Sequence, residues 1–488
     1  MRWAKWFGIV ALCMAWPAGS LGQRPVKLGP EVQKYVKYDV PRVLLTHVRV
    51  IDGTGGPAAE DRNVVIENGK IAAIEAGVDV SARDGQVVLN LRGESVIPGL
   101  VGMHNHLFYV AHPNLAADGT FDAPALVQQM TYSAPLLYLA GGVTTMRTTG
   151  SVEPYADLNL KRMIEEGQLA GPHLDVTGPN LEGTAGLRIE MHPLSGPEDA
   201  RRLVNYWADQ GVTSFKAYMN ITREELKAAI EEAHKRGIKV TGHLCAVTYP
   251  EAADSGIDGL EHGFFFNTQL DPGKQLDQCP KTMGQPTLKA MEPGGAVAKE
   301  LIAKLVEKHV AITSTLAVLE HRVPNQPPLQ QRVLNVMTPG ARERFLLARN
   351  VRAAQPVEKF AAMLRREMDL EREFVAAGGL LLTGPDPTGN GGTVPGFGDQ
   401  RGVELLVEAG FMPVEAIKIA SYNGALYLGG QEHFGTIALG KNADLVVVKG
   451  NPAAKIEDIE NVEVVFKDGV GYDPAKLLAA VRGHYGEY

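Results

Sequence analysis

The chain has 488 residues, of which 45% are hydrophobic and 21% are charged, and its formal net charge is −8. This length is too great for one small domain, and the composition is typical of a soluble globular protein. Because the net charge is negative and no run of basic residues occurs, the composition argues against nucleic acid as a partner.

The first 22 residues have the pattern of a secretory signal peptide. Arg2 and Lys5 give a cationic start, an apolar stretch follows, and Ser20 and Gly22 fit a small-x-small cleavage site. We therefore expect export to the periplasm or the extracellular space, with a mature protein that begins at Gln23. No other stretch is apolar enough to span a membrane, so no membrane contact is expected after cleavage. An uncleaved N-terminal anchor is the alternative.

Cleavage leaves two cysteines, Cys245 and Cys279. In an oxidising compartment they could pair, but the sequence does not show whether they lie close together. Two separate thiols are the simpler interpretation.

Two distant segments share a β-rich texture. Residues 42–98 alternate apolar and polar residues between Asp-Gly and Asn-Gly turns, and the same texture returns in "ADLVVVKGN" and "VEVVFKDG" near the end. We expect one small β-sandwich domain built from residues 42–98 and 430–472.

The middle of the chain, residues 99–429, alternates apolar strand candidates with helical stretches. The clearest helix follows Thr222, which forms a capping box with Glu225, and ends before Gly237. This alternation predicts an α/β fold, a (β/α)8 TIM-like barrel, over a doubly wound sheet, because the first strand lacks a Gly-rich phosphate turn. The strand candidates are "SVIPGLVGMHNH", "GGVTTMRTTG", "PHLDVTG", "VTSFKAY", "IKVTGHL", "IDGLEHG", "HVAITSTLAV" and "GLLLTGPD".

Polar residues stand at the carboxyl ends of several of these strands. In a barrel these ends meet at one mouth, where catalytic residues gather. Each residue alone has a structural explanation, but together in apolar strands they are costly to bury unless they are bonded or ligated. The sequence therefore predicts a metal site at the mouth. Its candidate ligands are His104, His106, Lys216, His243, His262 and Asp386.

The motifs "VIPGLVGMHNH", "GLEHG", "TGPD" and "ASYNGALYLG…GTIALGKNADLVVVKGNP" resemble those of the amidohydrolase superfamily, in the branch of Xaa-Pro dipeptidases and imidazolonepropionase-like hydrolases. The resemblance covers roughly residues 42–470. It implies a barrel with a β-sandwich and a metal-activated hydroxide that hydrolyses amide-like bonds in small molecules.

The resemblance also assigns the ligands. It implies that His104, His106 and Asp386 bind one metal and that His243 and His262 bind a second. In related binuclear enzymes a lysine at the place of Lys216 is carboxylated and bridges both ions. Histidine and carboxylate ligands favour Zn²⁺, although Mn²⁺, Co²⁺ or Fe²⁺ also fit. Asp386 would take the water's proton and pass it to the leaving nitrogen, as in the family.

Departures from the family leave the substrate open. The branch often carries Gly-Gly-His after the third strand and Arg-Asp after the second, whereas this chain has "TGPNLEG" and Arg147-Thr148. Candidate groups for a substrate carboxylate are Tyr218, Arg188, His321 and Arg322. Tyr218 is preferred, because strand alternation aims it to the same side as Lys216.

The leading hypothesis is hydrolysis of a dipeptide or an N-acyl amino acid. A cyclic-amide, lactone or ester hydrolase with the same metals is the alternative, and a non-catalytic binding protein is disfavoured because all six ligand candidates are present. A Cys245 nucleophile is a weaker option, because no activating dyad is visible. The oligomeric state stays open, a homo-oligomer included.

Overall fold

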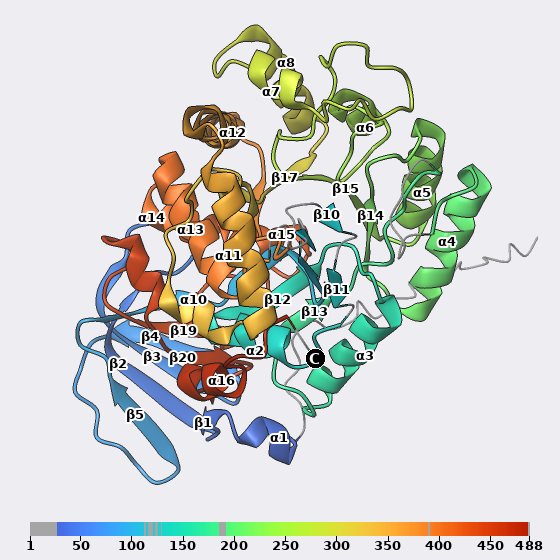
Figure 1. Cartoon of the computed structure of the whole chain (residues 1–488). Helices are drawn as coiled ribbons and strands as arrows, with labels where there is room; N and C mark the ends of the chain where they lie inside the picture. Colours follow the sequence, from blue (N-terminus) through green and yellow to red (C-terminus); the bar gives the residue numbers. More distant parts are fainter. Residues whose placement is uncertain are drawn as a thin grey trace, which may run out of the picture.

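Figure 1 shows the computed structural model of the chain, in which a β-sheet lies at one end of a larger α/β body. The residues described are 27–111, 114–115, 121–122, 125–127, 129–184, 192–388 and 391–486. The predicted signal peptide, residues 1–22, and the substrate candidate Arg188 lie outside them.

Each of the eight strand candidates contains a parallel strand. They form one sheet in the order β13-β12-β7 and a second in the order β14-β15-β16-β17-β18. The strands are β7 (Leu100–Asn105), β12 (Val143–Thr148), β13 (His173–Asp175), β14 (Ser214–Ala217), β15 (Lys239–Gly242), β16 (Gly259–Glu261), β17 (Ala311–Ser314) and β18 (Leu381–Thr383).

The two parallel sheets adjoin each other on both sides. Isolated parallel bridges link Thr177 to Ser214 and Leu181 to Ala217, which joins the β13 side to β14. On the other side, the amide of Asp386 donates to the carbonyl of His104 at 3.0 Å, which ties the end of β18 to β7. Among the described residues the ladders do not run continuously around all eight strands, so the fold is α/β with parallel sheets.

Helices alternate with the parallel strands. The predicted capping box is present at α5 (Arg223–Lys235), where Thr222 and Glu225 cap each other's backbone. The other helices are α1 (Pro30–Gln33), α2 (Ser133–Ala140), α3 (Pro154–Glu165), α4 (Pro197–Gln210), α6 (Tyr249–Asp254), α7 (Gln285–Ala290), α8 (Ala296–Glu307), α9 (Leu316–Glu320), α10 (Gln331–Val336), α11 (Pro339–Ala353), α12 (Val357–Ala376), α13 (Phe397–Ala409), α14 (Pro413–Ile419), α15 (Tyr422–Tyr427), the 3₁₀ helix η1 (Ile456–Glu460) and α16 (Pro474–Ala480). No helix in the described part of the chain is both long and apolar enough to cross a membrane.

Both ends of the chain contribute to a nine-stranded sheet, as the recurring β texture predicts. Its strands pair in one continuous network, mostly antiparallel, so a sandwich of two separate sheets is not confirmed. The strands are β1 (Val36–Tyr38), β2 (Arg42–Val50), β3 (Ala59–Glu67), β4 (Lys70–Ala76), β5 (Gln86–Asn90), β6 (Glu94–Pro98), β19 (Leu445–Lys449), β20 (Val462–Lys467) and β21 (Val470–Tyr472). Two short hairpins follow β7: β8 (Tyr109–Ala111) pairs with β11 (Ala125–Val127), and β9 (Asn114–Leu115) with β10 (Phe121–Asp122).

Strand β19 packs the nine-stranded sheet against the main core of the α/β body. Leu445 and Val447 lie in the sheet's own apolar cluster, whereas Val446 and Val448 belong to the main core. Successive strand residues point to opposite faces, so an uninterrupted apolar run is what a strand buried on both faces requires.

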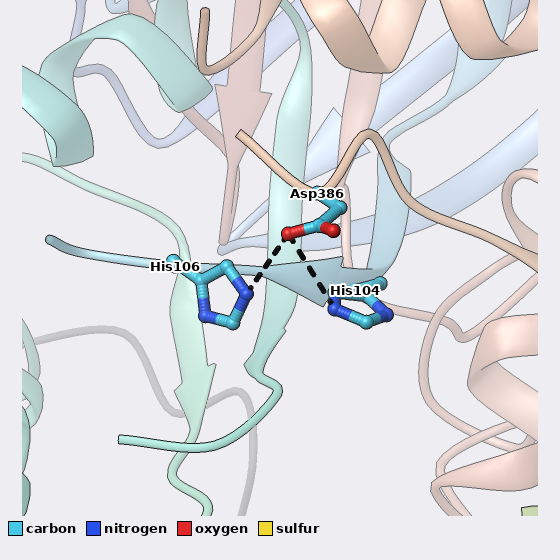
Figure 2. Close-up of side chains that lie close together, drawn as sticks. All are labelled: His104, His106 and Asp386. Carbon is cyan, nitrogen blue, oxygen red and sulfur yellow. Dashed lines mark ion pairs between the residues drawn. The ribbon is translucent and has the colours of Figure 1, made fainter. Parts of the chain in front are cut away.

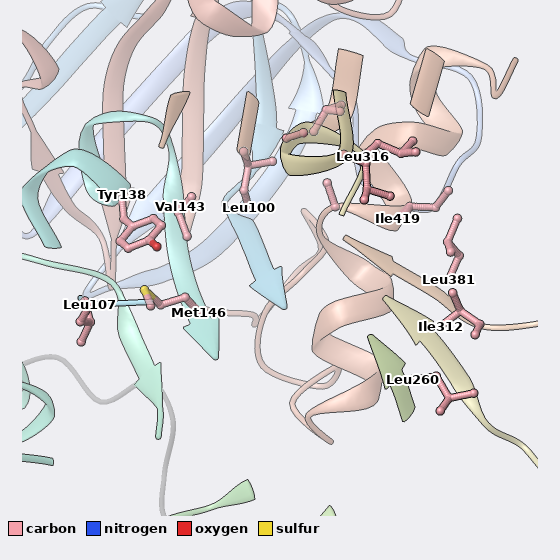
Figure 3. Packing of buried hydrophobic residues seen from close by; sticks show 14 of the residues in the cluster. Leu100, Leu107, Tyr138, Val143, Met146, Leu260, Ile312, Leu316, Leu381 and Ile419 are labelled. Carbon is pink, nitrogen blue, oxygen red and sulfur yellow. The ribbon is translucent and has the colours of Figure 1, made fainter. Parts of the chain in front are cut away.

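The main core lies between the parallel strands and their helices. Leu260, Ile312 and Leu381 are register partners on β16, β17 and β18 and are fully buried, and Figure 3 shows them following one another across the sheet. Each such side chain contributes about 1.5–3 kcal/mol of burial free energy. This packing fixes the strand ends that carry the polar residues.

The cysteine interpretation was wrong. Cys245 and Cys279 form a disulfide, with their Cα atoms 4.9 Å apart. Cys245 lies just beyond β15, and the segment after β16 folds back so that Cys279 reaches it. The sequence does not reveal the path of a long connection, and a bonded sulfur is no longer available as a nucleophile.

Candidate metal centre

The six predicted ligands converge at the carboxyl ends of the parallel strands. His104 lies within β7 and His106 just after it, and Lys216 lies within β14. Two further ligand candidates follow their strands directly, His243 after β15 and His262 after β16, and Asp386 lies three residues beyond the end of β18. This is the edge at which catalytic groups gather in parallel α/β folds.

The carboxylate of Asp386 lies between two imidazoles. Its Oδ1 is 3.1 Å from Nε2 of His106 and 3.7 Å from Nε2 of His104, and Figure 2 shows both rings directed at it. Asp386 has a φ of 50°, and His262 has a φ of 64°. Positive φ in non-glycine residues costs free energy and is found where surrounding structure enforces it, often at functional sites.

The remaining candidates complete the cluster. Nζ of Lys216 lies 3.2 Å from Nε2 of His104 and also donates to the carbonyl of Thr149 at 3.2 Å. The ring of His262 lies 4.6 Å from that of His104 and 4.4 Å from that of His243, measured between centroids. All six residues that were predicted from the strand ends therefore lie in one buried cluster.

Behind the cluster lies a carboxylate that the sequence did not single out as a site residue. Glu261 is fully buried, and its Oε2 accepts from Nδ1 of His104 at 2.7 Å. Its Oε1 accepts from Nη2 of Arg147 at 2.8 Å and from the hydroxyl of Thr241 at 2.5 Å. A carboxylate behind a histidine fixes the tautomer and leaves the other ring nitrogen free for a metal. An acid inside the apolar strand of "GLEHG" was the available signal.

Burial and neighbouring charges set the protonation states of the residues in the cluster. Burial lowers the pKa of His106 to about 4 and holds the pKa of His243 and His262 well below its usual range. Burial alone would raise the pKa of Asp386, but His104 and the other imidazoles outweigh it and lower that pKa. Neutral imidazoles beside an ionised carboxylate are the protonation states that bind divalent metals.

The cluster also contains buried nitrogen atoms that have no hydrogen-bond partner in the described part of the chain: Nδ1 of His106, Nε2 of His243 and Nε2 of His262. An unsatisfied buried polar atom is costly, and each one calls for a ligand. One ligand atom from each of His104, His106 and Asp386 lies within 4.8 Å of the others, a spacing that fits a metal ion. The donor set of this cluster therefore fits a metal centre.

The substrate candidates separate in the structure. Tyr218 packs on His243 with 4.9 Å between ring centroids, and Nζ of Lys216 lies 5.7 Å from its ring, so it borders the cluster. His321 instead faces Phe345 and lines a cavity of about 120 Å³ with residues of α13. Burial and the charge of Arg352 lower the pKa of His321 to about 3, which places it among arginines. Arg322 stacks over Phe265, with 4.7 Å from its Cζ to the ring centroid.

A second buried group of metal-binding residue types lies at the other end of the strands. His173 begins β13, and its Nε2 is 3.0 Å from Oδ2 of Asp468, in the turn after β20. The amide of Asp468 donates to Oδ1 of Asp444 at 2.8 Å. Lys467, also buried, interacts electrostatically with both carboxylates. These contacts form a buried polar network that links the nine-stranded sheet to β13.

A parallel α/β fold with a convergent His, Lys and Asp cluster at its strand ends has the donor set and the location of a metal-dependent catalytic site. Residues 95–470 match the family described as the Amidohydrolase family, and the chain belongs to that family. Enzymes of this family act on small-molecule substrates and generally use divalent metal ions.

Individual relatives are distant. An uncharacterized protein of Mycobacterium tuberculosis is 30% identical over 235 residues, which are 46% of this chain and 56% of that protein. The matched region thus spans about half the length of that relative. A solved structure of bottromycin amidohydrolase has a TM-score of 0.66 at 20% identity, covering 93% of this chain and 94% of that one. A Xaa-Pro dipeptidase with bound methionine has a TM-score of 0.64 at 22% identity, covering 88% and 100%. These structures show that the fold is shared.

Proposed function

We propose that this chain is an exported, binuclear metal hydrolase that cleaves the amide bond of a dipeptide or an N-acyl amino acid. The single observation that carries the proposal is the buried cluster in which imidazole nitrogens without partners surround Asp386 and Lys216. The likeness in fold to a Xaa-Pro dipeptidase supports the substrate class.

In this proposal, His104, His106 and Asp386 would hold one ion, and His243 and His262 would hold the other. Nζ of Lys216, as the neutral amine, would react with carbon dioxide and lose a proton, and the resulting carbamate anion would serve as a further ligand. Zn²⁺ is the proposed metal, because histidine and carboxylate donors suit it. The two parallel sheets would act as one eight-stranded barrel, since bridges join them at β14 and a hydrogen bond joins them at β7.

Divalent ions held in this way lower the pKa of water and polarise a carbonyl group. The chain's own residues would transfer the proton and orient the ligand side chains. The Asp386 carboxylate accepts a proton from water and donates it to the leaving nitrogen. The hydroxyl of Thr388 donates to Oδ1 of Asp386 at 3.0 Å and helps to orient it. Glu261 holds His104 by Nδ1, and Thr315 holds His262 in the same way, with its hydroxyl 2.9 Å from Nδ1.

Export has two supports: the charged, apolar and small-residue pattern of the first 22 residues, and the disulfide between Cys245 and Cys279. Disulfides persist in oxidising compartments and are rare in the cytosol. N-terminal sequencing of the exported protein is expected to begin near Gln23.

The substrate class is tested with the purified, metal-loaded enzyme on a panel of dipeptides, N-acyl amino acids, cyclic amides, lactones and esters. We expect a dipeptide or an N-acyl amino acid to have the highest kcat/KM. Faster hydrolysis of a lactone or a cyclic amide than of any linear amide would contradict the proposal and favour the alternative hydrolase.

A further inference from the structure

Arg322 carries a guanidinium group that forms no ion pair with an acidic side chain in the described ranges. Its neighbour Arg352, on α11, likewise has no acidic partner there and donates to the carbonyl of His321 at 3.1 Å. Two other arginines of this region are paired with acids: Arg401 contacts Glu320 at 2.7 Å, and Arg332 contacts Glu460 at 2.5 Å. Two cations without an acidic partner are an arrangement that an anion would stabilise.

The position of Arg322 connects it to the metal ligands. It follows β17 and α9, and its Cζ lies 4.7 Å from the ring centroid of Phe265 and 5.8 Å from that of Phe266. Phe266 in turn packs on His243 and His262, at 4.2 and 5.2 Å between centroids. One aromatic ring therefore separates the guanidinium from two candidate ligands.

The charge of Arg322 is retained and oriented. Desolvation by the surrounding protein and the nearby Arg352 lower its pKa to about 10, while Asp386 acts in the opposite direction. The group therefore remains charged at neutral pH, and although protein surrounds the guanidinium, part of the residue's surface is open to solvent. Stacking on aromatic rings favours a fixed guanidinium plane.

We infer that Arg322 binds the carboxylate that lies next to the scissile amide; this inference rests on the proposed function. A guanidinium presents paired donors that match a carboxylate in a bidentate contact. In a dipeptide or an N-acyl amino acid, the carboxylate is one residue from the amide carbonyl, about 3.6 Å of extended chain. Phe266 packs on both the guanidinium and the ligand imidazoles, so Arg322 borders the region of the candidate ligands, as Tyr218 does.

The inference is tested by comparing a carboxylate substrate with its carboxamide. The pair is the best N-acyl amino acid or dipeptide of the panel and the same compound with a neutral terminal amide. The enzymes are the metal-loaded wild type, Arg322→Gln, Arg322→Lys and the control Arg83→Gln, which removes one charge from an exposed site in the nine-stranded sheet's subdomain. Metal content is measured for each.

For the wild type and Arg83→Gln we expect the carboxylate form to be preferred by at least about tenfold in kcat/KM. Arg322→Gln is expected to lose about 10- to 100-fold on the carboxylate substrate and less than about threefold on the carboxamide, with unchanged metal content. Arg322→Lys keeps the charge without the paired donors and should fall between the two.

The failures are distinguishable. If the wild type cleaves these amides and Arg322→Gln keeps the same preference, or loses both activities equally, the inference is wrong and the proposed function stands. If the wild type cleaves neither substrate but hydrolyses lactones or cyclic amides, the proposed function itself fails, and the inference falls with it.

Discussion

Two buried groups of histidine and aspartate lie at opposite ends of the parallel strands, and they differ in what balances them. At the carboxyl ends, four imidazoles surround Asp386, and three of their nitrogens have no hydrogen-bond partner among the described residues. At the amino end, Nε2 of His173 lies 3.0 Å from Asp468, and the buried Lys467 interacts electrostatically with both Asp468 and Asp444. Atoms of His173, Asp444 and Asp468 also have no hydrogen-bond partner among the described residues, so the difference lies in the buried cation and not in the unpartnered atoms. Both groups have a spacing that fits a metal ion.

The comparison shows that residue type and spacing do not suffice to identify a metal centre. The first group has several neutral imidazoles and a carboxylate, Glu261, behind one of them. The second has one imidazole, two carboxylates and a buried lysine, so a cation of the chain already faces its carboxylates. We therefore assign chemistry to the first group and a structural role to the second.

The largest effect is the difference in kcat that we expect when an aspartate is replaced by asparagine in the first group and in the second. Asp386→Asn should fold but lose on the order of 10²–10⁴ in kcat, because the group that transfers the proton is gone. Asp444→Asn should keep kcat within about threefold, since Asp444 lies outside the proton path. Steady-state kinetics on the preferred amide measure both. Near-normal turnover by Asp386→Asn would remove Asp386 from the mechanism.

A smaller effect is expected behind the metal centre. Glu261→Gln replaces the carboxylate that accepts from Nδ1 of His104. Loss of such a partner typically costs 10- to 100-fold in metal affinity, so we expect a loss of about that size. Competition against a chelator with a known affinity measures it. Unchanged affinity would mean that the contacts of Glu261 with Arg147 and Thr241 are structural and that its contact with His104 does not support metal binding.

The smallest effect is expected in the second group, and it depends on pH. Burial would raise the pKa of Asp468, but His173 and Lys467 outweigh burial and lower it to about 2. A carboxyl with a lowered pKa stabilises the fold above its unfolded pKa, near 3.9, and the stabilisation is lost as the pH falls toward 2. Asp468→Asn should therefore lower the free energy of unfolding on the order of 1–2 kcal/mol at pH 7.

Urea unfolding of Asp468→Asn at pH 7 and pH 3 tests this prediction, with the exposed Asp84→Asn as the control. The difference from the wild type should shrink at the lower pH, and the metal content should not change. A larger difference at pH 3 than at pH 7 would reverse the assigned sign.

Much of the fold was predictable because the pattern is local. Strand candidates such as "IDGLEHG" and "GLLLTGPD" are short apolar runs between turns, and parallel topology then brings their ends together. His243 and Asp386 are far apart in sequence but meet for that reason.

What the sequence did not reveal depends on the paths of side chains and connections. The Cys245–Cys279 disulfide depends on how the segment after β16 folds back. Glu261 was visible in a motif, but its contacts with His104 and Arg147 arise from packing across three strands. His321 and Arg322 are adjacent in sequence, yet one lines a cavity and the other stacks on Phe265.

Metal content per chain, measured by mass spectrometry on the wild type and on Lys216→Ala, tests the central claim most directly. Lys216 lies 3.2 Å from His104, in the group to which we assign the metals. The account predicts two ions in the wild type, one or none in Lys216→Ala and two in Asp468→Asn. Two ions retained by Lys216→Ala, or ions lost from Asp468→Asn, would contradict it.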